Sequence, residues 1–480
     1  MTLLGIRAWR SKLRSPWTWL LLGLVGLGIL LRAWQYWYFP VAGETQDEVA
    51  WTLLGSSLLQ TGTPISWSYF KGYQVMEVVV HQGAEFPLVK PAVDHPPLFA
   101  LLPGMIQTFT GHFWKEIPSI KLVRFPLVLL GALNLSLFTV WLLKAKLKRV
   151  HVVTALLIAA TAPSLVFLSR LVVSENLLVT WLLLILILNT QEDDENQTSR
   201  GWRRWLWILV HAALPLTKIS GIAIGLGSLA TAWYRKDKAR FWSALDGLGV
   251  GVGLLMLYMA HYDFGLFWQV QTQQAQRDTG LLSLFSTWLW EPTLVREVFA
   301  DIWNQVGLIA LLAVAWLLPN LKKDEQCSLM AVLFLFMAQL AFLLLSVGEH
   351  TIHGWYRIVF WPLWAYVIGQ LVQYAWDKRN AVALAVSWLL MAPQLRLAGM
   401  YLLGEQWYDW QGDVNKVWLG LTGLALMTLF LFQRWQARAQ RGLWIALGIL
   451  LVLGQVVTVL LIQHERFWQD ALYLLQGIRP

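Results

Sequence analysis

Three carboxylates, Glu44, Asp47 and Glu48, follow closely on the first long apolar segment of the chain. A carboxylate beside an acceptor hydroxyl or amine can act as a general base and remove its proton. The alternative interpretation is a solvated loop whose charges do no chemistry. These residues therefore supply a candidate base, and its role depends on which groups the rest of the chain brings near it.

A second polar group occupies Lys90-Pro91-Ala92-Val93-Asp94-His95-Pro96-Pro97-Leu98. Proline fixes the backbone angle φ, so paired prolines direct a loop into the element that follows. We therefore expect Asp94 and His95 to be held rigidly. From these residues alone, His95 could donate to a phosphate or could hold a turn, and both interpretations stay open.

Several apolar segments end in a cation on the extracytoplasmic side. Lys and Arg normally concentrate on the cytoplasmic side, so these cations are exceptions. An ionisable group at membrane depth costs about 2.5–3.5 kcal/mol on insertion scales, so it usually points inward to a partner. Glu175 lies near one of these cations, Arg170. Single cations at such positions often extend toward the interface, but four on one side favour a shared anionic ligand such as a lipid-linked phosphate. The four are Arg124, Arg170, Lys218 and Arg357.

Composition indicates which elements must position these residues. Of 480 residues, 57% are hydrophobic and 14% are charged, against roughly 25% charged in soluble domains. A hydrocarbon core of about 30 Å needs about 20 apolar residues in a helix, and lipid cannot satisfy free backbone groups. The sequence therefore predicts an all-α integral membrane protein, with 1–480 as a single transmembrane domain.

The apolar segments predict about 13 transmembrane helices. They lie at 17–38, 122–143, 150–168, 171–189, 205–217, 219–234, 241–261, 303–319, 328–347, 355–375, 380–402, 417–433 and 443–463. The segments on either side of Thr217-Lys218 are short. We keep them separate because merging them would place the later basic clusters on the outer side.

Alternate connections collect the Lys and Arg residues, including Arg7 to Arg14, Lys144 to Arg149 and Arg235 to Arg240. Seven such clusters hold 22 of the 37 basic residues. Basic loops face the cytoplasm, so the N-terminus is predicted to be cytoplasmic. The net charge of +9 follows this topology rather than a basic face with interleaved aromatics, which excludes nucleic acid as a partner.

Two long connections fall on the opposite, extracytoplasmic side. The first, 39–121, carries the acidic motif and amphipathic stretches such as 48–59, so we expect interfacial helices in it. The second, 262–302, contains Gln269, Gln271, Gln273, Gln274 and Gln276. These amides could bind sugar hydroxyls, and a polar helix lying on the membrane explains them equally well.

Cysteine and carboxylate usage restricts the possible cofactors. Cys327 is the only cysteine, which excludes an intrachain disulfide and a cysteine-based metal cluster. Beyond the pair in the first loop, we find no clustered carboxylates that define a metal site. A divalent metal ion is compatible with the sequence but is not implied by it, so no metal ligand and no cofactor are assigned.

The order of these motifs resembles the C superfamily of integral membrane glycosyltransferases, in its protein mannosyltransferase and aminoarabinose transferase-like branch. The matching stretches run through most of the first 235 residues and recur near 350–362. They are Asp47-Glu48, Leu58 to Gly62, Asp94 to Leu98, Arg124-Phe125-Pro126, Pro163 to Arg170 with Glu175, Leu216-Thr217-Lys218, and His353 to Arg357 with Pro362.

The resemblance implies transfer of a sugar from a polyprenyl-phosphate donor to a lipid, glycan or protein acceptor, in a bacterial inner membrane and on its extracytoplasmic side. It implies that Asp47 is the catalytic base, supported by Glu48. Glu175 stands where the family more often has Asp, and His95-Pro96-Pro97 stands where the aminoarabinose branch has Lys-Pro-Pro. The implied donor-phosphate partners are Lys90, His95, Arg124, Arg170, Lys218 and Arg357, with Glu44, Asp94, Glu175, His353 and Tyr356 in support.

The chemistry agrees with this expectation, because a departing phosphate ester needs cations around its developing charge. The main rival is a transporter or flippase of a lipid-linked intermediate, which would place its binding groups near the bilayer midplane, often within inverted repeats. The sequence shows neither an inverted repeat nor a group of ionisable residues near the midplane of the predicted spans. A polymerase or ligase of polysaccharide export would carry its main basic loop late in the chain, and a purely structural scaffold would not need buried ionisable residues.

Overall fold

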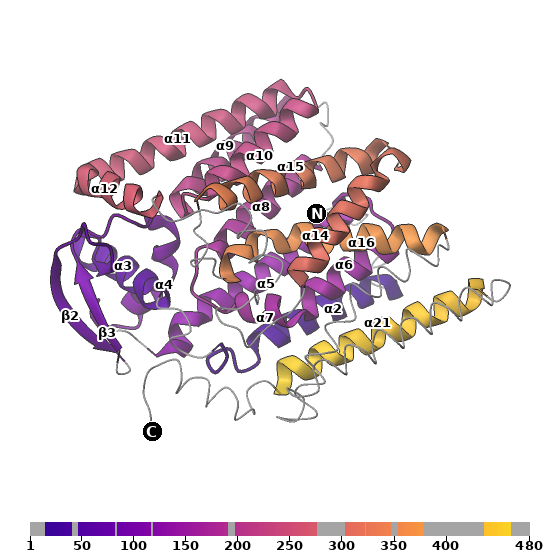
Figure 1. Cartoon of the computed structure of the whole chain (residues 1–480), viewed down its shortest axis with the longest axis horizontal. Helices are drawn as coiled ribbons and strands as arrows, with labels where there is room; N and C mark the ends of the chain where they lie inside the picture. The colour runs from indigo at the N-terminus through magenta and orange to yellow at the C-terminus, as the bar shows by residue number, and fades with distance from the viewer. Residues whose placement is uncertain are drawn as a thin grey trace.

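The computed structural model describes residues 15–40, 47–81, 84–116, 119–190, 197–275, 303–321, 323–346, 354–378 and 436–461. Long helices run side by side, and a small sheet lies at one end of them (Figure 1). The helices nearest the site in sequence are α2 (Pro16–Ala33), α5 (Ile120–Lys144), α6 (Arg149–Thr161), α7 (Pro163–Leu168) and α8 (Glu175–Asn189). The later ones are α9 (Gln197–Thr217), α10 (Gly221–Tyr234), α11 (Lys238–Tyr262), α12 (Phe264–Ala275), α14 (Trp303–Leu317), α15 (Lys323–Ser346), α16 (Trp361–Lys378) and α21 (Gln436–Leu461), with 3₁₀ helices η1 (Leu318–Asn320) and η3 (Gly354–Phe360).

Each predicted span inside the described residues coincides with a helix, and the differences have local causes. The predicted segment 150–168 divides into α6 and α7 at Pro163, because proline has no N–H to donate and is suited to the first position of a new helix. The segment 171–189 begins as a helix only at Glu175. The predicted spans 380–402 and 417–433 lie outside the described residues.

The two short segments around Thr217-Lys218 are separate helices, α9 and α10, as predicted. The chain turns sharply between them. A Cβ on Gly221 would lie 2.4 Å from the carbonyl oxygen of Leu214, so only glycine fits where α10 returns against α9. The break leaves Lys218 outside both helices, with its backbone N–H donating to the Leu214 carbonyl.

Within the described residues, five helical segments are long and apolar enough to cross a membrane by length and composition. They are Pro16–Ala33, Ile120–Lys144, Lys238–Tyr262, Glu325–Leu345 and Trp355–Lys378. Several further helices, such as α8 and α10, are apolar but shorter. The chain is therefore mostly helical and membrane-like, while the predicted number of 13 spans stays a prediction.

The all-α expectation is wrong in the first long connection, which contains a three-stranded antiparallel sheet in the order β1-β3-β2. The strands are β1 (Ser66–Trp67), β2 (Val75–His81) and β3 (Ala84–Val89). β-Branched residues favour a pleated strand, and β2 carries four valines. Phe86 and Leu88 of β3 are buried in the cluster that also holds Leu53, so the sheet covers the helices of this connection.

Those helices, α3 (Asp47–Thr61) and α4 (Pro97–Phe109), are parallel neighbours at the end of the molecule that carries the sheet (Figure 1). The ring of Trp51 near the start of α3 meets Phe99 near the start of α4. Farther along, the Gln60 amide donates to the Thr108 hydroxyl at 3.3 Å. Contacts in the same order along both helices place their two N-termini at the same end.

Gly55 and Gly104 allow this close approach. A Cβ added to Gly104 would lie 2.3 Å from the carbonyl carbon of Gly55, and one added to Gly55 would lie 1.8 Å from the oxygen of Ala100. Both distances are far below van der Waals contact. The backbone itself forms the interface, so no side-chain rotation can relieve an added methyl group.

Gly104→Ala is therefore expected to destabilise the protein by about 1–3 kcal/mol, the usual cost of overpacking. The measurement is the thermal unfolding temperature of the purified protein in detergent. Gly23→Ala in α2 is the matched control, because a Cβ there would meet nothing within 4 Å. Equal unfolding temperatures for the two variants would contradict the close helix contact.

Candidate active site

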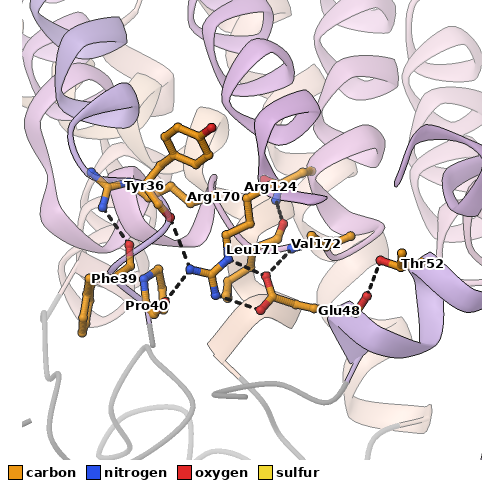
Figure 2. A network of polar contacts seen from close by, with 10 residues as sticks. Tyr36, Phe39, Pro40, Glu48, Thr52, Arg124, Arg170, Leu171 and Val172 are labelled. Carbon is orange, nitrogen blue, oxygen red and sulfur yellow. Dashed lines mark hydrogen bonds and ion pairs between the residues drawn. The ribbon is translucent and has the colours of Figure 1, made fainter. Parts of the chain in front are cut away.

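Glu48 and Arg124 form a buried, two-pronged ion pair (Figure 2). The Arg124 Nε donates to Glu48 Oε1 at 2.8 Å, and its Nη2 donates to Oε2 at 2.8 Å. The backbone N–H of Val172 also donates to Oε1, at 3.1 Å. This fork geometry is the strong form of an arginine–carboxylate contact. It joins α3 to α5 and to the loop before α8.

The same guanidinium holds the segment that follows α2. Arg124 Nη1 donates to the carbonyl oxygens of Tyr36 and Pro40. Arg170 adds a second clamp on this segment, since its Nη1 donates to the Phe39 carbonyl at 2.7 Å (Figure 2) and its other nitrogens donate to the carbonyls of Leu31, Arg32 and Trp34. The two arginines therefore fasten residues 31–40 to α5 and to the segment after α7.

Arg32 is a third buried arginine that the sequence analysis missed. Its guanidinium donates to the carbonyl oxygens of Gly28, Ala159 and Ala160 at 2.8–3.3 Å. It is 2% exposed. The sequence carried a usable signal, because an ionisable residue inside the predicted span 17–38 needs a partner at membrane depth.

These contacts give three of the predicted site residues a structural role. Arg124 is 0% exposed and Arg170 1% exposed, and each donates to protein acceptors along most of its guanidinium edge. The predicted contact of either group with a donor phosphate stays a prediction. Glu48 is likewise paired with Arg124 rather than open to a substrate. We infer that Glu48 and Arg124 are positioning residues for the start of α3, next to Asp47, and that Arg170 is a positioning residue for residues 31–40.

A different charged group gathers around Asp47, and we call it the site cluster. Lys218 Nζ forms an ion pair with Glu175, and His95 Nδ1 lies 3.2 Å from Asp94 Oδ1. The charges of all four residues act on the Asp47 carboxyl. The site cluster therefore consists of Asp47, Asp94, His95, Glu175 and Lys218. The Asp47 side chain is half-buried.

Every member of the site cluster stands at or just before the N-terminus of a helix. Asp47 opens α3 and Glu175 opens α8. His95 precedes Pro96 and Pro97, where α4 begins, and Lys218 precedes α10. Each helix N-terminus carries about +0.5 of an elementary charge and presents unpaired N–H groups to anions. The arrangement therefore favours a negative ligand near the two cations.

The electrostatic surroundings make Asp47 a better base than an ordinary aspartate. Burial raises the pKa of its carboxyl, the charges of His95 and Lys218 oppose this, and those of Glu175 and Asp94 add to it, so that the pKa stays raised. A base works best when its pKa approaches the working pH. The site can therefore remove a proton from a weak acid such as a hydroxyl or ammonium group.

Residues after β1 support the Asp94–His95 part of the site cluster, and the sequence analysis missed them. The Ser68 hydroxyl donates to Asp94 Oδ2 at 3.3 Å. The Tyr73 hydroxyl accepts the backbone N–H of Val93 at 3.0 Å. On the α3 side, the Trp51 ring stands edge-on to the imidazole of His95, with centroids 4.4 Å apart. Serine and tyrosine in a polar loop carry no sequence signal for such a role.

The remaining predicted site residues fall into separate places. Tyr356 of η3 lies against Lys218, whose Nζ is 4.7 Å from the ring centroid. Arg357, the next residue, is 3% exposed, and its proposed phosphate contact stays a prediction. Lys90 is exposed after β3 and forms no ion pair with any residue that the structure describes. Glu44 and His353 lie outside the described residues.

Two further expectations concern metals and the glutamine-rich connection. Among the described residues, no group of three or more His, Cys, Asp or Glu side chains is arranged to hold a metal ion. The described part of the connection 262–302 is the helix α12, on which the Gln269 side chain packs against Gly72, next to Tyr73. α12 therefore covers the loop that supports Asp94.

The fold has counterparts among solved structures. No protein-family model matches the sequence, and no curated protein matches it. The crystal structure of ArnT from Cupriavidus metallidurans bound to undecaprenyl phosphate aligns with 96% of this chain and 79% of that chain, at 14% identity and a TM-score of 0.54. The apo ArnT structure gives a TM-score of 0.49 at 14% identity over the same shares.

The apo oligosaccharyltransferase of Archaeoglobus fulgidus aligns with 97% of this chain and 59% of that chain, at 11% identity and a TM-score of 0.45. The comparison with lipid-bound ArnT is the one that carries weight, since it alone of these three has a TM-score above 0.5. Its low identity limits the conclusion to architecture. This chain therefore has an ArnT-like fold, with helices that are long and apolar enough to cross a membrane.

Proposed function

We propose that this protein is a membrane glycosyltransferase that uses a polyprenyl-phosphate-linked sugar and inverts the anomeric carbon. The observation that carries the proposal is the site cluster, in which the Asp47 carboxyl lies within electrostatic reach of two cations, His95 and Lys218, that stand before helix N-termini. The ArnT-like fold supports it, because the ArnT structure holds undecaprenyl phosphate. Transfer of either a hexose or a pentose fits this chemistry.

The donor phosphate is assigned to Lys218 and His95. Lys218 stands before α10 and His95 before α4, so their charges add to those of two helix N-termini. Each cation has its own carboxylate partner, Glu175 for Lys218 and Asp94 for His95. These partners hold the cations in place before the donor binds, which preorganises the site for the charge that develops on the leaving phosphate.

In the proposed step, an acceptor O–H or N–H loses its proton to the Asp47 carboxylate. The acceptor atom forms a bond to the anomeric carbon of the sugar, and the bond between that carbon and the phosphate oxygen breaks. The electron pair leaves with the polyprenyl phosphate, whose added charge faces Lys218 and His95. A single displacement of this kind inverts the configuration and needs one base.

The location and the partners complete the proposal. The basic clusters predict a cytoplasmic N-terminus, which puts α3, α4 and the sheet on the extracytoplasmic side of the bilayer. A bacterial inner membrane supplies polyprenyl-phosphate donors there. The acceptor is a lipid, a glycan or a protein, and nucleic acid has no role.

The proposal is tested with the purified protein in liposomes that contain polyprenyl-phosphate sugars and membrane extracts as acceptors. We expect release of free polyprenyl phosphate together with appearance of the sugar on an acceptor. Movement of an intact donor across the bilayer without any cleavage would overturn the enzyme and favour a flippase.

Lys218→Met is expected to weaken binding of undecaprenyl phosphate roughly 10- to 100-fold, because a hydrogen bond to a charged group contributes about 1.5–3 kcal/mol. The measurement is the affinity for the lipid in detergent. The variant leaves Glu175 unpaired, so Lys218→Met/Glu175→Gln separates the two effects. Full affinity in this double variant would remove Lys218 from phosphate binding. Lys90→Ala is the control and should bind the lipid as the native protein does, since Lys90 is exposed and outside the site cluster.

A further inference from the structure

The Asp94–His95 pair has more supporting contacts than phosphate binding by His95 alone requires. Asp94 is buried, with one carboxylate oxygen 3.2 Å from His95 Nδ1 and the other accepting from the Ser68 hydroxyl at 3.3 Å. The backbone before it is held by the bond from Val93 N–H to Tyr73. A carboxylate beside Nδ1 keeps a proton on that nitrogen. Any further protonation of His95 therefore takes place at Nε2.

The charge of the site cluster depends on this histidine. Asp47 of α3, Asp94 of the same loop and Glu175 of α8 are acids, whereas Lys218 before α10 is the one other cation of the site cluster. Tyr73 and Tyr258 also lie within electrostatic reach of Asp94. With His95 neutral, three carboxylates outnumber one ammonium. A further anion, the donor phosphate, is therefore accepted far more readily when His95 carries a charge.

We propose that Asp94 is a positioning residue that keeps His95 cationic for the donor phosphate, and that this pair sets an alkaline limit to donor binding. The inference rests on the proposed function. A lysine in place of His95 would instead stay charged well beyond neutral pH.

The direction of the effect follows from the surroundings of the imidazole. Burial lowers the pKa of His95, but the charge of Asp94 and its contact with Nδ1, together with the charge of Asp47, outweigh burial, so the pKa stays above its ordinary value. His95 is cationic below that pKa and neutral above it. Donor affinity is therefore full at the lower pH and falls as the pH rises through the pKa of His95.

The experiment measures the affinity of the full-length protein for undecaprenyl phosphate in detergent between about pH 6 and pH 9, a range that spans histidine titration. The phosphate monoester also titrates near the lower end, so His95→Lys provides the reference, because lysine keeps its charge across this range. We expect the ratio of native to His95→Lys affinity to fall about tenfold as the pH rises, the size of one lost charge-assisted hydrogen bond.

In Asp94→Asn, donor affinity relative to His95→Lys is still expected to fall as the pH rises, but at a lower pH than in the native protein. An amide keeps the shape of the carboxylate and its contact with Ser68, but it does not carry the charge. Glu77→Gln is the matched control, because Glu77 of β2 pairs with Lys115, a residue after α4, and both lie outside the site cluster. An unchanged midpoint in Asp94→Asn, or a ratio that does not vary with pH, overturns the inference. If the native protein does not bind the lipid at any pH, the proposed function itself fails.

Discussion

Asp47→Asn is expected to abolish sugar transfer while leaving donor binding intact. Asparagine has nearly the same shape but cannot accept the acceptor's proton, and loss of a general base typically costs 10²- to 10⁴-fold in rate. The bound donor is held by Lys218 and His95 in our proposal, and neither residue is altered. The measurement compares the transfer rate with the affinity for undecaprenyl phosphate in the same preparation.

Asp246→Asn is the matched control for this variant, because Asp246 is an exposed residue of α11 that lies 3.6 Å from Arg204 and takes no part in the site cluster. A pH profile adds a second criterion. The base must be deprotonated, and burial raises the pKa of Asp47, so the native rate should rise with pH through an acid limb above the usual range of aspartate. Full activity in Asp47→Asn would remove this residue from the mechanism.

The second large effect is expected from Arg124→Ala. Removing one partner of a buried ion pair typically costs about 3–5 kcal/mol, because the other charge stays buried without compensation. Here the loss would leave Glu48 opposite an empty volume and would free the carbonyls of Tyr36 and Pro40. We expect a large fall in the thermal unfolding temperature, and a fall in transfer rate through displacement of Asp47.

A double variant separates packing from positioning. Glu48→Leu/Arg124→Leu removes both charges, and replacing a buried pair by apolar groups is often neutral for stability. We expect this variant to regain much of the lost unfolding temperature but not the transfer rate, since the anchor for the start of α3 is gone. Normal stability of Arg124→Ala combined with weak donor binding would instead return Arg124 to the phosphate site.

Much of the architecture followed from local sequence patterns. Apolar segments bounded by charge predict helices because a helix satisfies its own backbone within the segment, and Pro163 and Gly221 account for the breaks around α7 and α10. The exception is β2, in a connection where we expected only helices. The valines of β2 can be buried in a helix or in a strand, so their hydrophobicity does not distinguish the two. The strand forms because its backbone pairs with β3.

The candidate site was only partly predictable. The sequence identified Asp47, His95, Glu175 and Lys218 from residue type and motif order, and the structure brings them together. It also suggested one common pocket for all four outlying cations. In the structure, Arg124 and Arg170 belong to a separate buried network that holds residues 31–40. Ser68 and Tyr73 gave no signal, because their role depends on the position of Asp94.

The amino-acid sequence alone predicted helices apolar enough to cross a membrane and, within a few residues, where most of those that the structure describes lie. The tertiary structure alone decided which carboxylate meets which cation. Glu48 and Arg124 are 76 residues apart, and Glu175 and Lys218 are 43 apart. The hydrophobic effect is not directional, so it does not determine which helices pack against one another. Partners are settled only when close packing brings specific side chains within hydrogen-bond distance.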